Sequence, residues 1–165
     1  MKPQVAPYRY NDVELRLLKR DDLPMTLAWR NRYDVRMWFN TSDIIGEDQH
    51  QIWFERYLDK TNDFVFIVEV DGRPVGQVSI YAIDAASGSA EIGRFIAAPG
   101  EDGKGYMRAA IAGLIELAKW HFKLNRIYLE VFEHNERAIG LYQKLGFQKN
   151  KASSNMLEFS MSIQQ

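Results

Sequence analysis

The stretch AAPGEDGKGYMRAA, residues 97–110, places three glycines and a lysine between a predicted strand and a predicted helix. This order suits an anion site, because loop amides and the positive end of the helix point toward the same ligand. A P-loop is excluded, since Tyr106 and Met107 stand where that motif needs a lysine and a hydroxyl. A dinucleotide fingerprint is also excluded, because Arg108 replaces its third glycine and the preceding strands form hairpins. A turn that merely joins strand to helix remains an alternative.

A second motif, NERAIGLYQKLGF at residues 135–147, follows the glycine-loop helix after one further strand. With both motifs, the sequence resembles the GNAT superfamily of N-acetyltransferases over almost the whole chain and in the same element order. The cofactor loop of that family typically reads V-x-P-x-x-R-G-K-G-x-G. Residues 97–107 match this pattern at Pro99, Gly103, Lys104 and Gly105.

The resemblance implies that the loop holds the pyrophosphate of acetyl-CoA, the acetyl donor. The implied contacts are with Gly103, Lys104, Gly105, Tyr106 and Met107. Two positions depart from the family pattern: Asp102 stands where Arg or Gln is usual, and Met107 where Gly or Ala is usual. Either the backbone amides and Lys104 suffice for binding, or the loop binds its cofactor weakly.

The resemblance also implies where the thioester lies. The strand EIGRFI is expected to diverge from the strand RIYLEVF, with pantetheine inserted between them and paired with the backbone near Phe95 and Ala97. An amide near Phe95 would then hold the carbonyl oxygen of the acetyl group. Gly93 fits this arrangement, because a glycine within a strand often marks a bulge.

Two residues of the second motif match functional positions of the family. Asn135 matches the asparagine beside the pantetheine arm, and Tyr142 matches the general acid that protonates the departing thiolate. A phenol with a pKa near 10 is protonated at neutral pH and is competent for that task. The structural alternatives are a helix N-cap for Asn135 and a core aromatic for Tyr142.

The two sequence motifs do not identify a single residue as the general base. Glu91 lies on the strand beside the expected thioester and is our candidate for the catalytic base, acting through water. The alternative is a solvent-exposed acid at the start of a strand. Glu130 and His134 are further candidates on the neighbouring strand and its exit.

The acceptor is suggested by the early helices. LAWRNRYDVRMWF (27–39) and IIGEDQHQIWF (44–54) resemble the enzymes that acetylate UDP-linked 4-amino-4,6-dideoxy sugars in the pseudaminic-acid pathway. On that resemblance, Arg30, Asn31 and His50 bind a nucleotide-sugar. An arginine grips phosphate bidentately, and Arg32 and Arg36 add positive charge that favours an anionic acceptor. Similar patterns also occur in acetyltransferases that act on protein N-termini or polyamines.

Composition limits the remaining possibilities. The chain has 165 residues, no cysteine and a formal net charge of −1, so disulfides, thiolate nucleophiles and generic nucleic-acid binding are not expected. We also expect no metal and no membrane partner, because cysteine is absent and no apolar run approaches the roughly 20 residues that span a bilayer. A cytoplasmic location suits these features, and a homodimer is possible.

The predicted architecture is a single α/β (α+β) domain over residues 1–165. Residues 1–12 form a loose arm, and a mostly antiparallel sheet of six or seven strands is flanked by four or five helices. Asp71-Gly72 closes a tight hairpin, because both residues tolerate positive φ. By resemblance, the sheet is splayed between its fourth strand, AEIGRFI, and its fifth, RIYLEVF.

Taken together, the sequence predicts an acetyl-CoA-dependent N-acetyltransferase that acts on a primary amine by direct attack in a ternary complex. A UDP-linked 4-amino sugar is the leading acceptor. A protein N-terminal amine or a polyamine is the alternative within the same chemistry. From a different class, the same fold would serve as an idle acyl-CoA-binding regulatory module, which the departures at Asp102 and Met107 favour and Tyr142 disfavours.

Overall fold

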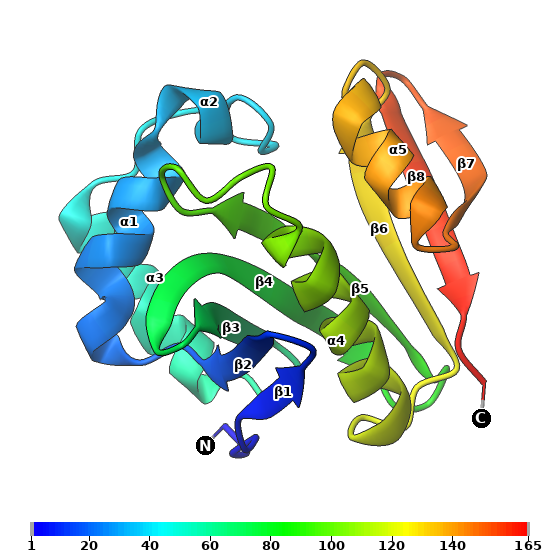
Figure 1. Ribbon diagram of the computed structural model, residues 1–165, viewed down its shortest axis with the longest axis horizontal. Helices are drawn as coiled ribbons and strands as arrows, with labels where there is room; N and C mark the ends of the chain where they lie inside the picture. Colours follow the sequence, from blue (N-terminus) through cyan, green and yellow to red (C-terminus); the bar gives the residue numbers. More distant parts are fainter. Residues whose placement is uncertain (1, 165) are drawn as a thin grey trace.

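A computed structural model describes residues 2–164 and has one mixed sheet at its centre (Figure 1). The sheet has eight strands in the order β1-β2-β3-β4-β5-β6-β8-β7. Neighbours are antiparallel except for the parallel pair β5–β6. The strands are β1 Tyr8–Tyr10, β2 Val13–Leu17, β3 Phe64–Val70, β4 Arg73–Asp84, β5 Ser89–Ala97, β6 Arg126–Phe132, β7 Gln148–Ser153 and β8 Met156–Ser162.

Helices cover both faces of the sheet. They are the 3-10 helix η1 Arg20–Asp22 and the α-helices α1 Leu23–Asn31, α2 Tyr33–Arg36, α3 Glu47–Asp59, α4 Tyr106–Trp120 and α5 Glu136–Lys144. The fold class and the predicted number of helices are therefore confirmed, whereas the sheet has eight strands and not the predicted six or seven. Helix α2 ends at Arg36, and the Phe39 ring of the following turn lies 4.3 Å from the Arg30 guanidinium.

The alternation of β3 explains the layered packing. Phe64, Phe66 and Val68 belong to the core that includes α4 and the motif residue Tyr142. Val65 and Ile67 belong to a second core that includes Phe54 and Tyr57 of α3. Successive side chains of a strand point to opposite faces, so the unbroken apolar run FVFIVEV is a strand covered on both sides.

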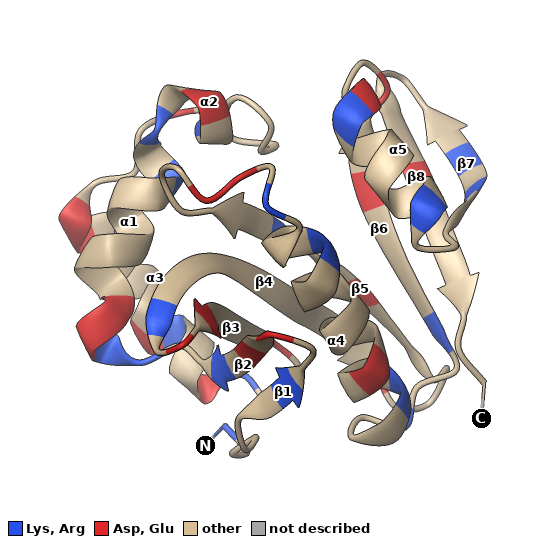
Figure 2. Cartoon of the chain, viewed as in Figure 1, with Lys and Arg blue, Asp and Glu red and all other residues tan. Residues whose placement is uncertain are grey.

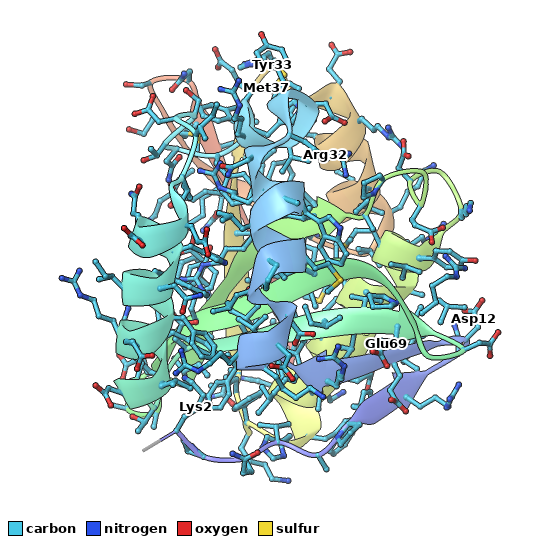
Figure 3. All side chains as sticks on the ribbon, turned by 90° about the vertical axis from the view of Figure 1, so that its left-hand side faces the viewer. Lys2, Asp12, Arg32, Tyr33, Met37 and Glu69 are labelled. Atoms are coloured by element: carbon cyan, nitrogen blue, oxygen red, sulfur yellow. The ribbon has the colours of Figure 1, made fainter. Side chains whose placement is uncertain are left out.

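The N-terminal arm is more ordered than predicted. Tyr8–Tyr10 forms β1 and pairs with β2, and the Tyr10 side chain packs against Gly113 of α4. Lys2 lies beside the C-terminal end of α3 (Figure 3), where its ammonium donates to the backbone carbonyls of Lys60 and Asp63. These tertiary contacts order the arm, and they cannot be predicted from the local composition of residues 1–12.

One turn and one helix cap follow their predicted chemistry. Asp71 and Gly72 both have positive φ and close the β3–β4 hairpin. Asn135 caps α5, with its side chain accepting from the Ala138 amide at 3.3 Å. Asp22 precedes α1 without a side-chain cap, because its carboxylate accepts from the Lys19 amide and the Arg16 guanidinium instead.

The sheet opens between β5 and β6, as predicted. The two strands pair only over Ser89–Glu91 and Arg126–Tyr128, and beyond these residues they diverge. Figure 1 shows β6, β8, β7 and α5 leaning away from the rest of the sheet, with the gap widest beside the N-terminal end of α4. This divergence positions the candidate site.

Residues 2–164 contain neither a helix that could span a membrane nor a group of side chains that could hold a metal ion. No helix in this range has the length and apolar character needed to cross a membrane. No three His, Asp or Glu side chains of the same residues are grouped in a way that would hold a metal ion.

Candidate active site

A cleft of about 980 Å³ lies where β5 and β6 diverge. One wall consists of β5, the glycine loop and the start of α4, and the other of β6 and α5. Nine of the ten predicted cofactor and catalytic residues line the cleft. These nine are Glu91, Phe95, Ala97, Gly103, Gly105, Tyr106, Met107, Asn135 and Tyr142.

The glycine loop forms an open cradle at one end of the cleft. Gly103 and Gly105 have φ of +76° and +82°, which residues with a Cβ rarely adopt. A Cβ built at either position meets no atom within 4 Å, so the space in front of the backbone is free. Gly105 also stands at the N-cap of α4, where the helix presents its unpaired amides. The loop therefore has the form of an anion site.

The charged side chains of the loop are paired with one another. Lys104 Nζ donates to Glu101 Oε1 at 2.8 Å, and Arg73 also contacts the Glu101 carboxylate. Lys104 itself does not line the cleft. Asp102 lies 3.9 Å from Arg137 of α5, which places opposite charges on the two walls of the cleft. Figure 2 shows the acidic part of this loop across the gap from the start of α5, which carries one acidic and one basic segment.

Phe95 and Tyr142 face each other across the cleft. Their ring centroids are 6.0 Å apart, although one residue is on β5 and the other on α5. Tyr142 is buried, and burial raises the pKa of its phenol above the usual 10.0. Within residues 2–164 its hydroxyl has no hydrogen-bond partner. A protonated, uncommitted phenol is thus available at this point.

Glu91 lies further along β5 with another carboxylate nearby. Its Oε2 accepts from the Tyr81 hydroxyl at 3.3 Å. Burial raises the pKa of Glu91, and the charge of Glu130 on β6 raises it further, while Tyr81 and Arg94 act in the opposite direction. Among the described residues, neither Glu91 nor Glu130 forms an ion pair. This end of the cleft is therefore acidic.

The predicted acceptor residues are arranged differently. Arg30 lines the cleft, and its Nη2 donates to the Thr41 carbonyl at 2.5 Å. Asn31 and His50 do not line it. Asn31 exchanges two 2.8 Å hydrogen bonds with the Ile45 backbone, and His50 stacks on Trp53 with its Nε2 3.3 Å from Thr26 Oγ1. The geometry of Asn31 and His50 is that of residues that hold the early helices together.

The other early arginines are also engaged within the fold. Arg32 donates to the Ala97 carbonyl and to the Asp34 carboxylate, each at 2.9 Å. Arg36 donates to the Ser42 carbonyl at 2.9 Å. Figure 3 shows Arg32 beside α2, whose Tyr33 and Met37 lie at the molecular surface. Arginines that we predicted to make the acceptor end positive therefore form hydrogen bonds within the fold. These bonds hold α2 against β5 and against the loop that follows α2.

Sequence reasoning missed several lining residues, among them Tyr81 and Arg94. Tyr81 is on β4 opposite Glu91, and Arg94 is on β5 directly after the predicted bulge glycine. The strand pairing was the only available signal. An alternating pattern places Tyr81 on a face but does not say that the face ends in a cleft.

The chain is similar in sequence to known proteins. A family model described as an acetyltransferase (GNAT) domain matches residues 12–148. A spermidine N(1)-acetyltransferase of Escherichia coli is 30% identical over 138 residues, covering 83% of this chain and 73% of the relative.

Two solved structures have the same fold. One is spermidine N-acetyltransferase from Vibrio cholerae in complex with CoA and spermine, with a TM-score of 0.80, 21% identity and coverage of 92% of this chain and 96% of that one. The other is FdhC, described as a nucleotide-linked sugar GNAT, with a TM-score of 0.83, 18% identity and coverage of 95% and 90%.

Proposed function

The chain belongs to the acetyltransferase (GNAT) family, and we propose that it acetylates a primary amine of a polyamine. Membership of the family makes it an N-acetyltransferase that uses acetyl-CoA. The choice of acceptor is our proposal. It is supported by the charge of the cleft and by the spermidine acetyltransferases among the relatives.

The residues present fit acetyl-CoA. The cradle formed by Gly103 and Gly105, with the start of α4 behind it, suits a pyrophosphate. The diverging edge of β5 at Phe95 and Ala97 suits an extended amide-bearing arm, because strand edges carry free backbone donors and acceptors. When bound, acetyl-CoA supplies an activated acetyl thioester.

The single observation that carries the acceptor proposal is the acidic end of the cleft. Glu91 and Glu130 both line it without a cationic partner among the described residues. The nearby arginines are occupied by Thr41, Ala97, Asp34 and Asp63. A polyamine brings several ammonium groups, which such carboxylates attract. For this reason a polyamine takes precedence over the nucleotide-sugar that the early helices suggested.

Each residue then has a defined role. Glu91, with its raised pKa, accepts the proton that the acceptor ammonium must lose before attack. The Phe95 amide donates to the carbonyl oxygen of the acetyl group, where negative charge develops. The Tyr142 hydroxyl gives a proton to the sulfur that departs. Asn135 lies beside the same cleft and orders the start of α5.

The test measures free thiol released from acetyl-CoA with spermidine and spermine, a UDP-linked 4-amino sugar and an N-terminal peptide. We expect turnover with the polyamines. Glu130→Gln should raise the KM for spermidine roughly 5- to 10-fold, since one rim charge typically contributes about 1 kcal/mol, and should leave kcat within about twofold. Glu133→Gln is the matched control, because Glu133 directly follows β6 but does not line the cleft. Turnover with peptide or sugar alone would contradict the proposal.

A second acceptor class is favoured by one specific observation. Arg30 is only 8% exposed, yet its Nη1 has no partner among the described residues, and the same holds for Nε of Arg36. Unpaired buried guanidinium nitrogens favour an anionic ligand group. A nucleotide-linked amino sugar would supply one. Turnover with the UDP-linked amino sugar that is lost in Arg30→Gln, together with no turnover of polyamines, would favour this class.

A further inference from the structure

The backbone of β5 is irregular beside the acetyl site. Ser79 of β4 pairs with Gly93, and Gln77 pairs with Ile96, so Arg94 and Phe95 stand opposite Val78 alone. This is a β-bulge with two residues against one. Arg94 takes a φ of +56°, a conformation unfavourable for a residue with a Cβ. Such a conformation persists only where its surroundings enforce it.

The enforcing contacts surround Arg94. Its guanidinium donates to both carboxylate oxygens of Asp63, at 2.8 and 3.1 Å, and lies 4.1 Å from the centre of the Tyr81 ring. Its carbonyl accepts from Gln77 Nε2 at 3.2 Å. The Arg94 side chain and carbonyl are thus held from β4 and from the loop before β3.

Asp63 is itself firmly anchored. Its side chain is 4% exposed, and it stands immediately before β3. The ammonium of Lys2 donates to its backbone carbonyl from the N-terminal arm, and Lys60 Nζ lies 3.9 Å from its carboxylate. A bidentate pair to such a fixed carboxylate restrains the direction of the guanidinium, and hence the backbone from which it extends.

We propose that Asp63 and Arg94 form a positioning pair that sets the β5 bulge and thereby aims the Phe95 amide at the acetyl carbonyl. The inference rests on the proposed function of that amide. Neither residue donates to or accepts from the reacting atoms. Their effect is on the placement of a donor, and rates depend steeply on such placement.

A purely structural ion pair would change stability alone, so the experiment needs a matched pair elsewhere. Arg16 and Asp22 provide it, with distances of 2.8 and 2.9 Å and similar burial, and neither residue lines the cleft. Asp22→Asn and Arg16→Lys are therefore the controls for Asp63→Asn and Arg94→Lys.

We expect Asp63→Asn and Arg94→Lys to lower kcat by about tenfold or more, with the KM for acetyl-CoA changed less than about threefold. The double variant should lose no more than the more impaired single variant, because the two residues act as a unit. The controls should lower the melting temperature with kcat retained. Unchanged kcat in Asp63→Asn, or an equal loss in Asp22→Asn, would overturn the proposal.

A second readout is independent of turnover. The chemical shift of the Phe95 amide, followed by NMR, should change more in Asp63→Asn than that of the Ile92 amide on the same strand. It should not change in Asp22→Asn. If the wild-type protein acetylates no amine, the proposed function fails and this readout alone decides the pair. An unchanged Phe95 amide shift in Asp63→Asn then rejects it.

Discussion

Tyr142 illustrates how burial prepares a single side chain for a task. Its ring packs between Phe95 and Phe147, and its hydroxyl has no partner among residues 2–164. Burial disfavours the phenolate and raises the pKa. The residue thus stays protonated at neutral pH and holds a proton that it can give to the sulfur as negative charge develops there in the transition state.

Tyr142→Phe removes only the hydroxyl, so packing and cofactor contacts are retained. We expect kcat to fall about 10²- to 10⁴-fold, the usual size of a general-acid contribution, while acetyl-CoA affinity by calorimetry changes less than about twofold. Tyr128→Phe, on β6 outside the cleft lining, is the control and should keep full activity. A variant with wild-type kcat would remove Tyr142 from the proton transfer.

At the scale of elements, the close packing of β4 against β5 depends on one glycine, Gly93 of β5. A Cβ on Gly93 would lie 2.4 Å from the Tyr81 hydroxyl, and the next ring atom is at 3.4 Å. The same hydroxyl donates to Glu91. The glycine therefore makes room for the tyrosine that holds the candidate base.

Gly93→Ala should push the Tyr81 ring aside and destabilise the protein by about 1–3 kcal/mol, as overpacking does. Adding Tyr81→Phe removes the clashing atom and should restore most of that loss. Urea unfolding of the wild type, both single variants and the double variant measures the coupling. Additive losses would show that the close contact is not the cause.

At the scale of the whole molecule, one cation ties three segments together. Arg16 on β2 donates to Asp22 of η1 and to Glu69 of β3 at 2.8–2.9 Å. This cluster joins β2 and β3 to the helical layer that carries Arg30. Burial alone would raise the pKa of Asp22, but the hydrogen bonds from Arg16 and Lys19 lower it overall.

A lowered carboxyl pKa makes the cluster sensitive to acid. The unfolded chain, with the usual value of 3.8, binds protons at a higher pH than the folded chain does. The contribution of Asp22 is therefore complete above about pH 5 and fades as the pH falls through and below 4. Asp22→Asn should cost about 2 kcal/mol at pH 7 and much less at pH 3 in denaturant unfolding. A loss independent of pH would contradict this explanation.

The sequence by itself predicted most of the elements and the glycine loop that forms one end of the cleft. Hydrophobic alternation, the Asp71-Gly72 turn and the Asn135 cap act over a few neighbours, and the glycine loop carries its own backbone geometry. These signals are local, so the residues that produce them can be recognised without knowledge of what lies across the fold. Family resemblance then joined the loop to Tyr142.

The acceptor end was decided only by tertiary structure. Arg30, Arg32 and Arg36 suggested a positive pocket, yet each of them donates within the fold, to two carbonyls of their own loop, to the Ala97 carbonyl and to Asp34. Asn31 and His50 hold helices together, and Glu91 meets Glu130 only because β5 and β6 pair in parallel. A sequence gives only the number of charged residues, whereas the charge of a site also depends on which of those residues are paired with residues far away in the sequence. Those partners are brought together by the fold alone.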